Sequence, residues 1–177
     1  VIQDRFDDLI EQGFDLAIRT GTLEDSSLIC KRLVTSCWHA FASPAYIERH
    51  GAPQTLDQLQ QHECLLFSHQ QTGEADWPCI SPAGETSVRV NGRFRANSLL
   101  ALCEAALDGM GIAFLPLYMV RHERAAGALM PVLESQLYRR VGIYALYPQS
   151  RFLPPKTRAF IELLETMFEA EAENFRH

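Results

Sequence analysis

The fold is decided by the segment Arg95-Ala-Asn-Ser-Leu-Leu-Ala-Leu-Cys-Glu-Ala-Ala-Leu-Asp-Gly-Met-Gly-Ile-Ala-Phe-Leu-Pro116. Asn97 and Ser98 are both good N-cap residues and stand directly before an apolar run. Gly109 suits the left-handed position just past a helix, and 112–115 is a continuous apolar run, typical of a strand covered on both faces. The helix between them has one apolar face at the i, i+3, i+4, i+7 spacing, made by Leu99, Leu102, Cys103, Ala106, Leu107 and Met110.

The start of this predicted helix has the chemistry of an anion site. The first N–H groups of a helix have no acceptor within it, and the helix dipole adds a partial positive charge there. Asn97, Ser98 and the amide of Leu99 are therefore candidate ligand contacts. The alternative is that Asn97 and Ser98 only cap the helix and face water.

Composition limits what the chain can do. Its 177 residues are 47% hydrophobic and 21% charged, which is ordinary for one globular domain or two small lobes. There are 22 acidic and 16 basic residues, and the formal charge is -6. A chain that gripped the DNA backbone would usually show the opposite balance, so we expect this chain itself to bind DNA poorly.

The cysteines and the hydropathy pattern indicate a cytoplasmic protein. No apolar run approaches the roughly 20 residues that a membrane helix needs, and the first residues, 1–8, are too acidic for a signal peptide. An odd number of scattered cysteines, with no C-x-x-C pair, fits free thiols in a reducing compartment. The five are Cys30, Cys37, Cys64, Cys79 and Cys103.

Helix and strand patterns alternate along the rest of the chain. That alternation predicts an α/β fold with mostly parallel sheets. Strands are predicted at 14–18 (buried), 28–42, 64–67 and 137–147. Helices are predicted at 44–49, 55–61 and 117–124, and a last helix opens at Pro154-Pro155 and extends to 170.

Several polar and aromatic residues stand where a strand ends, the usual place for ligand contacts in open α/β sheets. Arg19 and Thr20 follow the first predicted strand, and Arg19 could hold a carboxylate with two parallel hydrogen bonds or form a salt bridge instead. Ser68 begins a loop that lines a site or has no role. Phe114 and Tyr147 offer apolar contact to a ligand or pack in the core.

The sequence does not favour a metal site or catalysis, and no cofactor is expected. His62, Cys64 and His69 could ligate zinc, but compact zinc motifs usually have two close ligand pairs and only one pair is close here. There is no G-x-S-x-G elbow. Gly109 and Gly111 follow a helix rather than open one, so they do not form a phosphate loop.

Four stretches, in this order, resemble the effector domain of LysR-type transcriptional regulators. They are Phe14-Asp-Leu-Ala-Ile-Arg-Thr-Gly21, Ala42-Ser-Pro-Ala-Tyr-Ile-Glu-Arg-His-Gly51, the segment 95–116, and Ala145-Leu-Tyr-Pro followed by Pro154-Pro-Lys-Thr-Arg-Ala-Phe-Ile161. No single stretch is decisive, but together they extend over nearly the full chain.

The resemblance implies a two-lobed fold like that of the type II periplasmic binding proteins, each lobe a mixed, mostly parallel sheet flanked by helices. Lobe I would be 1–42 with 147–177, and lobe II would be 43–146. The family's winged helix-turn-helix, linker helix, and first strand and helix of lobe I have no counterpart here, so lobe I is expected to be incomplete. The resemblance also places Gln3 at the effector cleft.

By this resemblance the chain senses a small effector, a carboxylate or other anion, in the cleft between the lobes. Binding would shift the arrangement of a homodimer or higher oligomer, and DNA would be reached only through the N-terminal domain of the parent regulator. Two alternatives remain open: a stand-alone solute-binding protein of the same fold, and a small metal-dependent or thiol enzyme.

Overall fold

The computed structural model describes residues 14–21, 28–68, 76–81, 84–149, 154–171 and 175. Gln3, predicted at the effector cleft, and His69, considered as a zinc ligand, lie outside the described residues. The chain forms two compact units, Val1–Ser36 with Val141–Phe175 (unit 1) and Cys37–Arg140 with Arg176–His177 (unit 2). The lobe limits inferred from the sequence stay a prediction.

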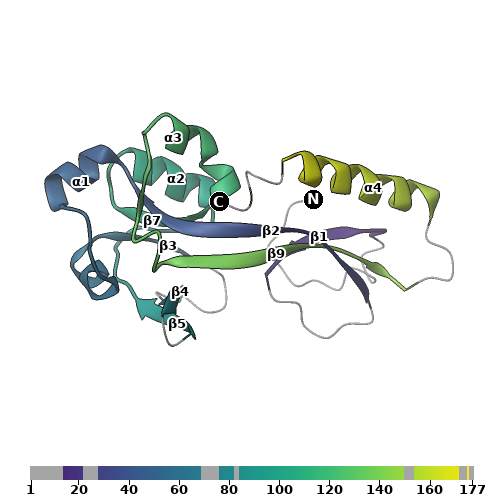
Figure 1. Cartoon of the computed structure of the whole chain (residues 1–177), viewed down its shortest axis with the longest axis horizontal. Helices are drawn as coiled ribbons and strands as arrows, with labels where there is room; N and C mark the ends of the chain where they lie inside the picture. The colour runs from purple at the N-terminus through teal and green to yellow at the C-terminus, as the bar shows by residue number, and fades with distance from the viewer. Residues whose placement is uncertain are drawn as a thin grey trace. The chain divides into compact units, whose positions relative to one another are not determined.

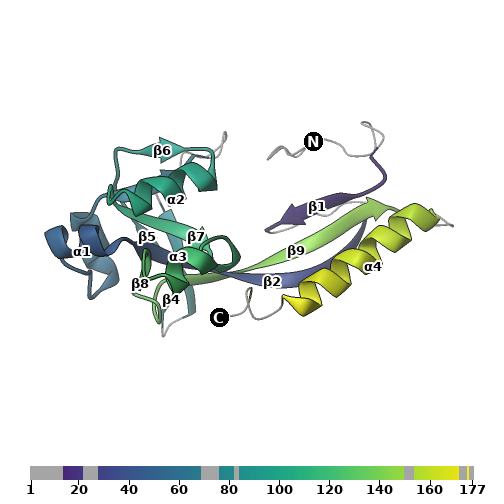
Figure 2. The same cartoon turned by 90° about the horizontal axis from the view of Figure 1, so that it is seen from above.

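Unit 1 consists of strands covered by one helix (Figure 1). Strand β1 pairs antiparallel with β9, which is followed in the sheet order by β2. Helix α4 lies over β2 and β9 (Figure 2), and its Phe168 packs against Val34 and Ile143. The elements are β1 (Ala17–Thr20), β2 (Leu28–Ala42), β9 (Tyr138–Pro148) and α4 (Pro155–Ala170), where β2 and β9 also continue into unit 2.

The strands predicted at 28–42 and 137–147 are confirmed, but the prediction of a buried strand at 14–18 is wrong. The strand begins only at Ala17, and Phe14 and Ile18 are 38% and 42% exposed. The reason is its place in the sheet: β1 stands at the end of the strand order and pairs with β9.

Unit 2 contains a mixed sheet and a separate hairpin. Strand β3 is parallel to both β6 and β7, whereas β2 is antiparallel to β7 and β8. The mixed α/β sheet is confirmed, although antiparallel pairs have a larger share of the described pairings than predicted, because β2 runs against its neighbours. The strands are β3 (Cys64–Phe67), β4 (Asp76–Ser81), β5 (Gly84–Arg89), β6 (Arg95–Ala96), β7 (Ile112–Pro116) and β8 (Met130–Val132).

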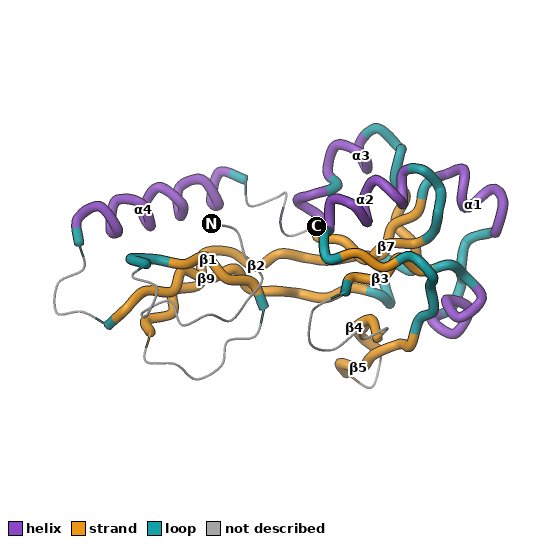
Figure 3. Tube along the Cα trace, turned by 180° about the vertical axis from the view of Figure 1, so that it is seen from behind, coloured by secondary structure: helices purple, strands orange, loops and turns teal. Residues whose placement is uncertain are grey.

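The two faces of this sheet bury two different cores. Helices α2 and α3 lie on one side of the strands and the hairpin β4–β5 lies on the other (Figure 3). Along β7, Ala113 and Leu115 belong to the helix-side core, and Ile112 and Phe114 to the hairpin-side core. The helical elements are α1 (Pro44–His50), η1 (Leu56–Gln61), α2 (Leu99–Leu107), η2 (Leu117–Met119) and α3 (Arg121–Ala125).

The segment that decides the fold has the predicted order, with one error at the end of its helix. Ser98 caps α2, Gly109 has φ 71°, and β7 is buried at every position. Met110, predicted on the apolar face, is 47% exposed. The helix ends at Leu107, so Met110 lies beyond its last turn and no longer follows the helical spacing.

His39 is a titratable group within unit 2. It is 9% exposed, stacks on Tyr138 with ring centroids 6.1 Å apart, and its Nδ1 is buried without a hydrogen-bond partner. Burial lowers the pKa of His39 from 6.5, the Glu134 carboxylate opposes this shift, and Arg124 adds to it. The neutral ring is therefore the form that fits the folded state.

We expect acid to destabilise unit 2 through His39. Since the folded pKa is depressed, the unfolded chain binds more protons below pH 6.5, and stability is lost as the pH falls from 6.5 toward the folded pKa. A His39→Phe variant should lose less free energy of unfolding between pH 7.5 and pH 5, measured by urea denaturation. His62, whose pKa burial and His50 also lower, is present in both proteins, so the difference isolates His39. An equal loss in both would contradict this assignment.

Candidate functional site

The strongest candidate site lies where two parallel strands of unit 2 end. In the β3–β6 register Phe67 faces Ala96, so Ser68 and Asn97 are the next residues at the same edge of the sheet. The Ser68 N–H donates to the Ala96 carbonyl at 2.8 Å, which fixes the two chain segments together. Ser68 is half-buried and Asn97 is exposed. Two residues that are 29 positions apart thus meet, as carboxyl ends of parallel strands do.

Helix α2 begins at this same edge. Ser98 is its N-cap, with extended backbone angles of φ -127° and ψ 119°, and its hydroxyl accepts from the Ala101 N–H at 3.4 Å. The N–H groups of Leu99 and Leu100 have no acceptor inside the helix, and the dipole of the helix is positive here. The structure therefore brings together four predicted contacts, which we call the α2 corner: Ser68, Asn97, Ser98 and Leu99.

Leu100 is a residue of this corner that the sequence reasoning missed. It lies in the first turn of α2 and its side chain is 63% exposed. The apolar spacing had selected its neighbour Leu99 and left Leu100 off the buried face. Leu100 could have been predicted, because an apolar residue outside the buried face of a helix points toward solvent. Here it lies next to polar groups that suit an anion.

Phe114 is placed apart from the α2 corner. It is 8% exposed, and its ring lies 5.7 Å from that of Trp77 and 6.0 Å from that of Trp38, measured between centroids. All three belong to the hairpin side of the sheet, whereas α2 packs on the other side. The structure thus gives Phe114 the core-packing role, because side chains alternate between the faces of a strand.

In unit 1 the predicted contacts Thr20 and Tyr147 lie at opposite ends of the β1–β9 pair. Thr20 faces Ile143 and Arg19 faces Tyr144, whereas Ala17 faces Leu146 at the other end of β1. Tyr147 follows Leu146, so the antiparallel pairing puts it a strand length away from Thr20. Tyr144, directly across from Arg19, was missed, because only the register reveals that partner.

Two of the zinc candidates, His62 and Cys64, have other partners. Nδ1 of His62 lies 3.1 Å from the Tyr46 hydroxyl, and the Cys64 thiol is fully buried and points to the Leu59 carbonyl at 3.8 Å. Burial raises the pKa of the Cys64 thiol to about 12, which keeps it protonated rather than as the thiolate that a metal requires. No group of three or more possible metal ligands occurs in the described ranges.

The burial of the thiols in unit 2 also argues against nucleophilic catalysis by a cysteine there. Burial is the main reason that the pKa of Cys103 rises to about 11, and nearby Glu123 and Glu104 raise it further. Burial also raises the pKa of Cys79. These thiols behave as small apolar core residues rather than as nucleophiles.

Known proteins with similar sequences are transcriptional regulators. The model of the LysR substrate binding domain matches residues 2–169. The HTH-type transcriptional regulator PtxR of Pseudomonas aeruginosa is 36% identical over 162 residues, which are 91% of this chain and 51% of that protein. An HTH-type transcriptional regulator of Haemophilus influenzae is 34% identical over 84% of this chain and 51% of its own length.

Solved structures agree with the sequence comparisons. The regulatory domain of CrgA from Neisseria meningitidis, a LysR-type transcriptional regulator, superposes with a TM-score of 0.81 at 30% identity, over 93% of this chain and 80% of that one. The full-length Vibrio cholerae virulence activator AphB also gives 0.81, at 28% identity, over 94% of this chain and 56% of that one.

The chain spans about half the length of the curated relatives that it matches. None of the helices in the described ranges has both the length and the hydropathy to cross a membrane. The family match extends over both units and includes the α2 corner. The chain belongs to the LysR substrate-binding domain family, and is an effector-binding domain of LysR-type transcriptional regulators.

Proposed function

We propose that this chain senses a small anionic effector, and that the α2 corner holds the effector's carboxylate. The single observation that carries the proposal is the meeting of Ser68, Asn97 and the N-terminus of α2 at one edge of the sheet. Two side-chain polar groups, a hydroxyl at the cap and the open amides of the first turn all favour negative charge.

The rest of the effector would contact less polar groups. Leu100 is exposed in the first turn of α2, so an apolar body attached to the carboxylate finds contact there. Arg19 and Thr20 of unit 1 stay predicted effector contacts, because an arginine side chain can pair a carboxylate. Tyr147 and Gln3, the latter outside the described residues, remain predicted contacts, whereas Phe114 packs in the hairpin-side core.

Sensing rather than catalysis is the proposed activity of the parent protein. Its family is one of transcriptional regulators, which favours this role over transport of a solute. Effector binding would shift the populations of dimeric arrangements, and a separate part of the parent protein would contact DNA, since this chain carries a formal charge of -6. A cytoplasmic homodimer or higher oligomer is the corresponding assembly.

Two substitutions at Ser98 test the corner by changing its charge while keeping a capped helix. Asparagine and aspartate are both good N-cap residues, but only aspartate adds a negative charge beside a bound carboxylate. We expect an effector at a hundred times its Kd to stabilise the native chain and Ser98→Asn by about 2.7 kcal/mol. In Ser98→Asp the affinity should fall at least about tenfold through charge repulsion.

Thermal unfolding of the three proteins, with and without a panel of small carboxylates, measures this effect. An effector that stabilises Ser98→Asp as much as Ser98→Asn would show that its anion lies elsewhere. An Arg19→Ala variant is tested in the same way. If the effector shifts its unfolding temperature as much as that of the native chain, Arg19 is not an effector contact, and the proposal for the α2 corner is unaffected.

A further inference from the structure

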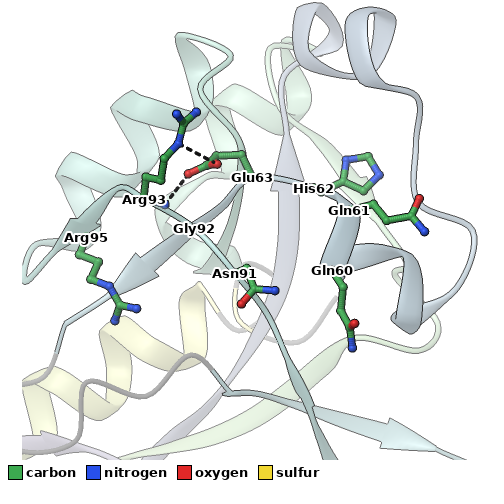
Figure 4. A pocket seen from close by; sticks show the side chains of 8 residues that line it. All are labelled: Gln60, Gln61, His62, Glu63, Asn91, Gly92, Arg93 and Arg95. Atoms are coloured by element: carbon green, nitrogen blue, oxygen red, sulfur yellow. Dashed lines mark hydrogen bonds and ion pairs between the residues drawn. The ribbon is translucent and has the colours of Figure 1, made fainter.

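A second polar site occupies the other end of β3. A hollow of about 480 Å³ lies before the start of β3, where Glu63 is five positions from Ser68 of the α2 corner, and its lining extends to Arg95 in β6. Figure 4 shows Arg93 and Arg95 on one side of it, and Gln60, Gln61 and His62 on the other. Its lining contains no apolar side chain and consists of Gln60, Gln61, His62, Glu63, Asn91, Gly92, Arg93 and Arg95.

The hollow exists because the chain passes close to β3 at a glycine. A Cβ built on Gly92 would lie 1.7 Å from the Cys64 carbonyl oxygen, so only glycine allows this approach. The Cys64 N–H donates to the Asn91 carbonyl at 2.9 Å and holds the two segments together. Because Gly92 has no side chain, the segment 91–93 lies directly against β3 and forms one wall of the hollow.

The carboxylate in the hollow is already paired. Glu63 accepts from the Arg93 N–H at 2.5 Å with one oxygen, and its other oxygen lies 3.4 Å from Arg93 Nε. The Arg93 side chain is nevertheless 94% exposed, so its terminal guanidinium nitrogens face solvent. Glu63 thus orients Arg93 without covering it.

The hydrogen bond at Nδ1 makes Nε2 of His62 a hydrogen-bond donor. The Tyr46 hydroxyl accepts from the Glu63 N–H at 3.0 Å and can donate its one proton to His62 Nδ1 at 3.1 Å. A neutral imidazole that accepts at Nδ1 carries its proton on Nε2. Burial and nearby His50 both lower the pKa of His62, which favours this neutral form.

Hydrogen-bond donors therefore predominate among the side chains that line the hollow. Arg93 and Arg95 line it together with one carboxylate, that of Glu63. Amide groups from Asn91 and the glutamines can donate to or accept from hydroxyls. Pockets for drug-like ligands are mostly apolar, so an all-polar hollow of this size suits a hydrophilic ligand.

We propose that this hollow is a second ligand site, which binds a small hydroxylated carboxylate of the sugar-acid class. Arg93, positioned by Glu63, holds the carboxylate, and Asn91 and the glutamine amides bind the hydroxyls. The site is separate from the α2 corner, so a ligand here is a second input to the same unit.

Gluconate is the probe, and sorbitol is its neutral counterpart with the same number of carbons. In amide NMR spectra of the ¹⁵N-labelled chain, gluconate should shift Glu63, Gly92 and Arg93 in a saturable manner, while sorbitol binds at least tenfold more weakly. Arg93→Ala should weaken gluconate binding at least tenfold. Arg140→Ala removes an exposed arginine outside the hollow and should leave it unchanged.

The same titrations contain the results that would overturn the proposal. Gluconate shifts that do not saturate, or that persist at equal affinity in Arg93→Ala, would remove the site. Inorganic phosphate or sorbitol binding as tightly as gluconate would remove the assignment to hydroxylated carboxylates. Ser98→Asp should bind gluconate as the native chain does, which separates this site from the α2 corner.

Discussion

Replacing Gly92 with alanine is expected to destabilise unit 2 by more than about 4 kcal/mol, beyond the usual range for a single substitution. The new Cβ would lie 1.7 Å from the Cys64 carbonyl oxygen and 2.8 Å from its carbonyl carbon. Both atoms are backbone atoms of β3, between β6 and β7 in the sheet, so no flexible side chain can move aside. Urea denaturation followed by circular dichroism measures the loss.

Gly127→Ala is the matched control. Gly127 has φ 70°, which alanine tolerates poorly, but an added Cβ would meet no atom within 4 Å. Its cost should therefore be backbone strain alone, about 1–2 kcal/mol. If Gly92→Ala cost no more than Gly127→Ala, the close approach of 91–93 to β3 would be refuted, together with the origin of the hollow.

Phe114→Ala is the second large effect. Removing a fully packed phenylalanine costs about 3–5 kcal/mol, because the neighbours fill the cavity only in part. The ring packs near both Trp38 and Trp77, so both indoles lose a neighbour. Since the chain has two tryptophans, intrinsic fluorescence of the folded variant should change along with its urea midpoint.

Leu100→Ala provides the comparison for Phe114. Leu100 is also apolar but 63% exposed, so its truncation should change the free energy of unfolding by less than about 0.5 kcal/mol. A Phe114→Ala variant as stable as Leu100→Ala would mean that Phe114 is not in the core. It would then return as a candidate for ligand contact.

Local chemistry made the α2 segment predictable from sequence. Ser98 caps the helix and Gly109 takes the left-handed conformation, because both signals depend on neighbouring backbone atoms alone. The strand at Ile112–Pro116 followed from its unbroken apolar run. The polar chemistry of the α2 corner could be predicted for the same reason.

Features that depend on pairing between distant segments could not be read in this way. The exposure of Ile18 follows from the edge position of β1, and the separation of Thr20 from Tyr147 follows from the antiparallel register. Local sequence is also misleading at Thr55 and Gln58, whose residue types and spacing suit a capping box. Thr55 makes no side-chain cap, and Gln58 Oε1 instead accepts from the Gln54 N–H at 2.6 Å.

The hollow beside His62 is the clearest case of a feature hidden from sequence. Gln60 and Arg93 are 33 positions apart and line opposite sides of the same hollow, and the segment with Arg93 is held against β3 where Gly92 approaches Cys64. Glycine occurs both at close backbone approaches and in open turns, so the sequence alone does not distinguish the two roles.

The most direct test of the α2 corner is an amide NMR titration of the ¹⁵N-labelled chain with the carboxylate that stabilises it most. The account predicts that the N–H signals of Leu99, Leu100 and Ser68 move together and saturate at one affinity. The amides of Leu99 and Leu100 face the anion, and the Ser68 amide, bonded to the Ala96 carbonyl, lies at the same edge of the sheet. Saturable shifts confined to other residues, with these three signals unmoved, would contradict it.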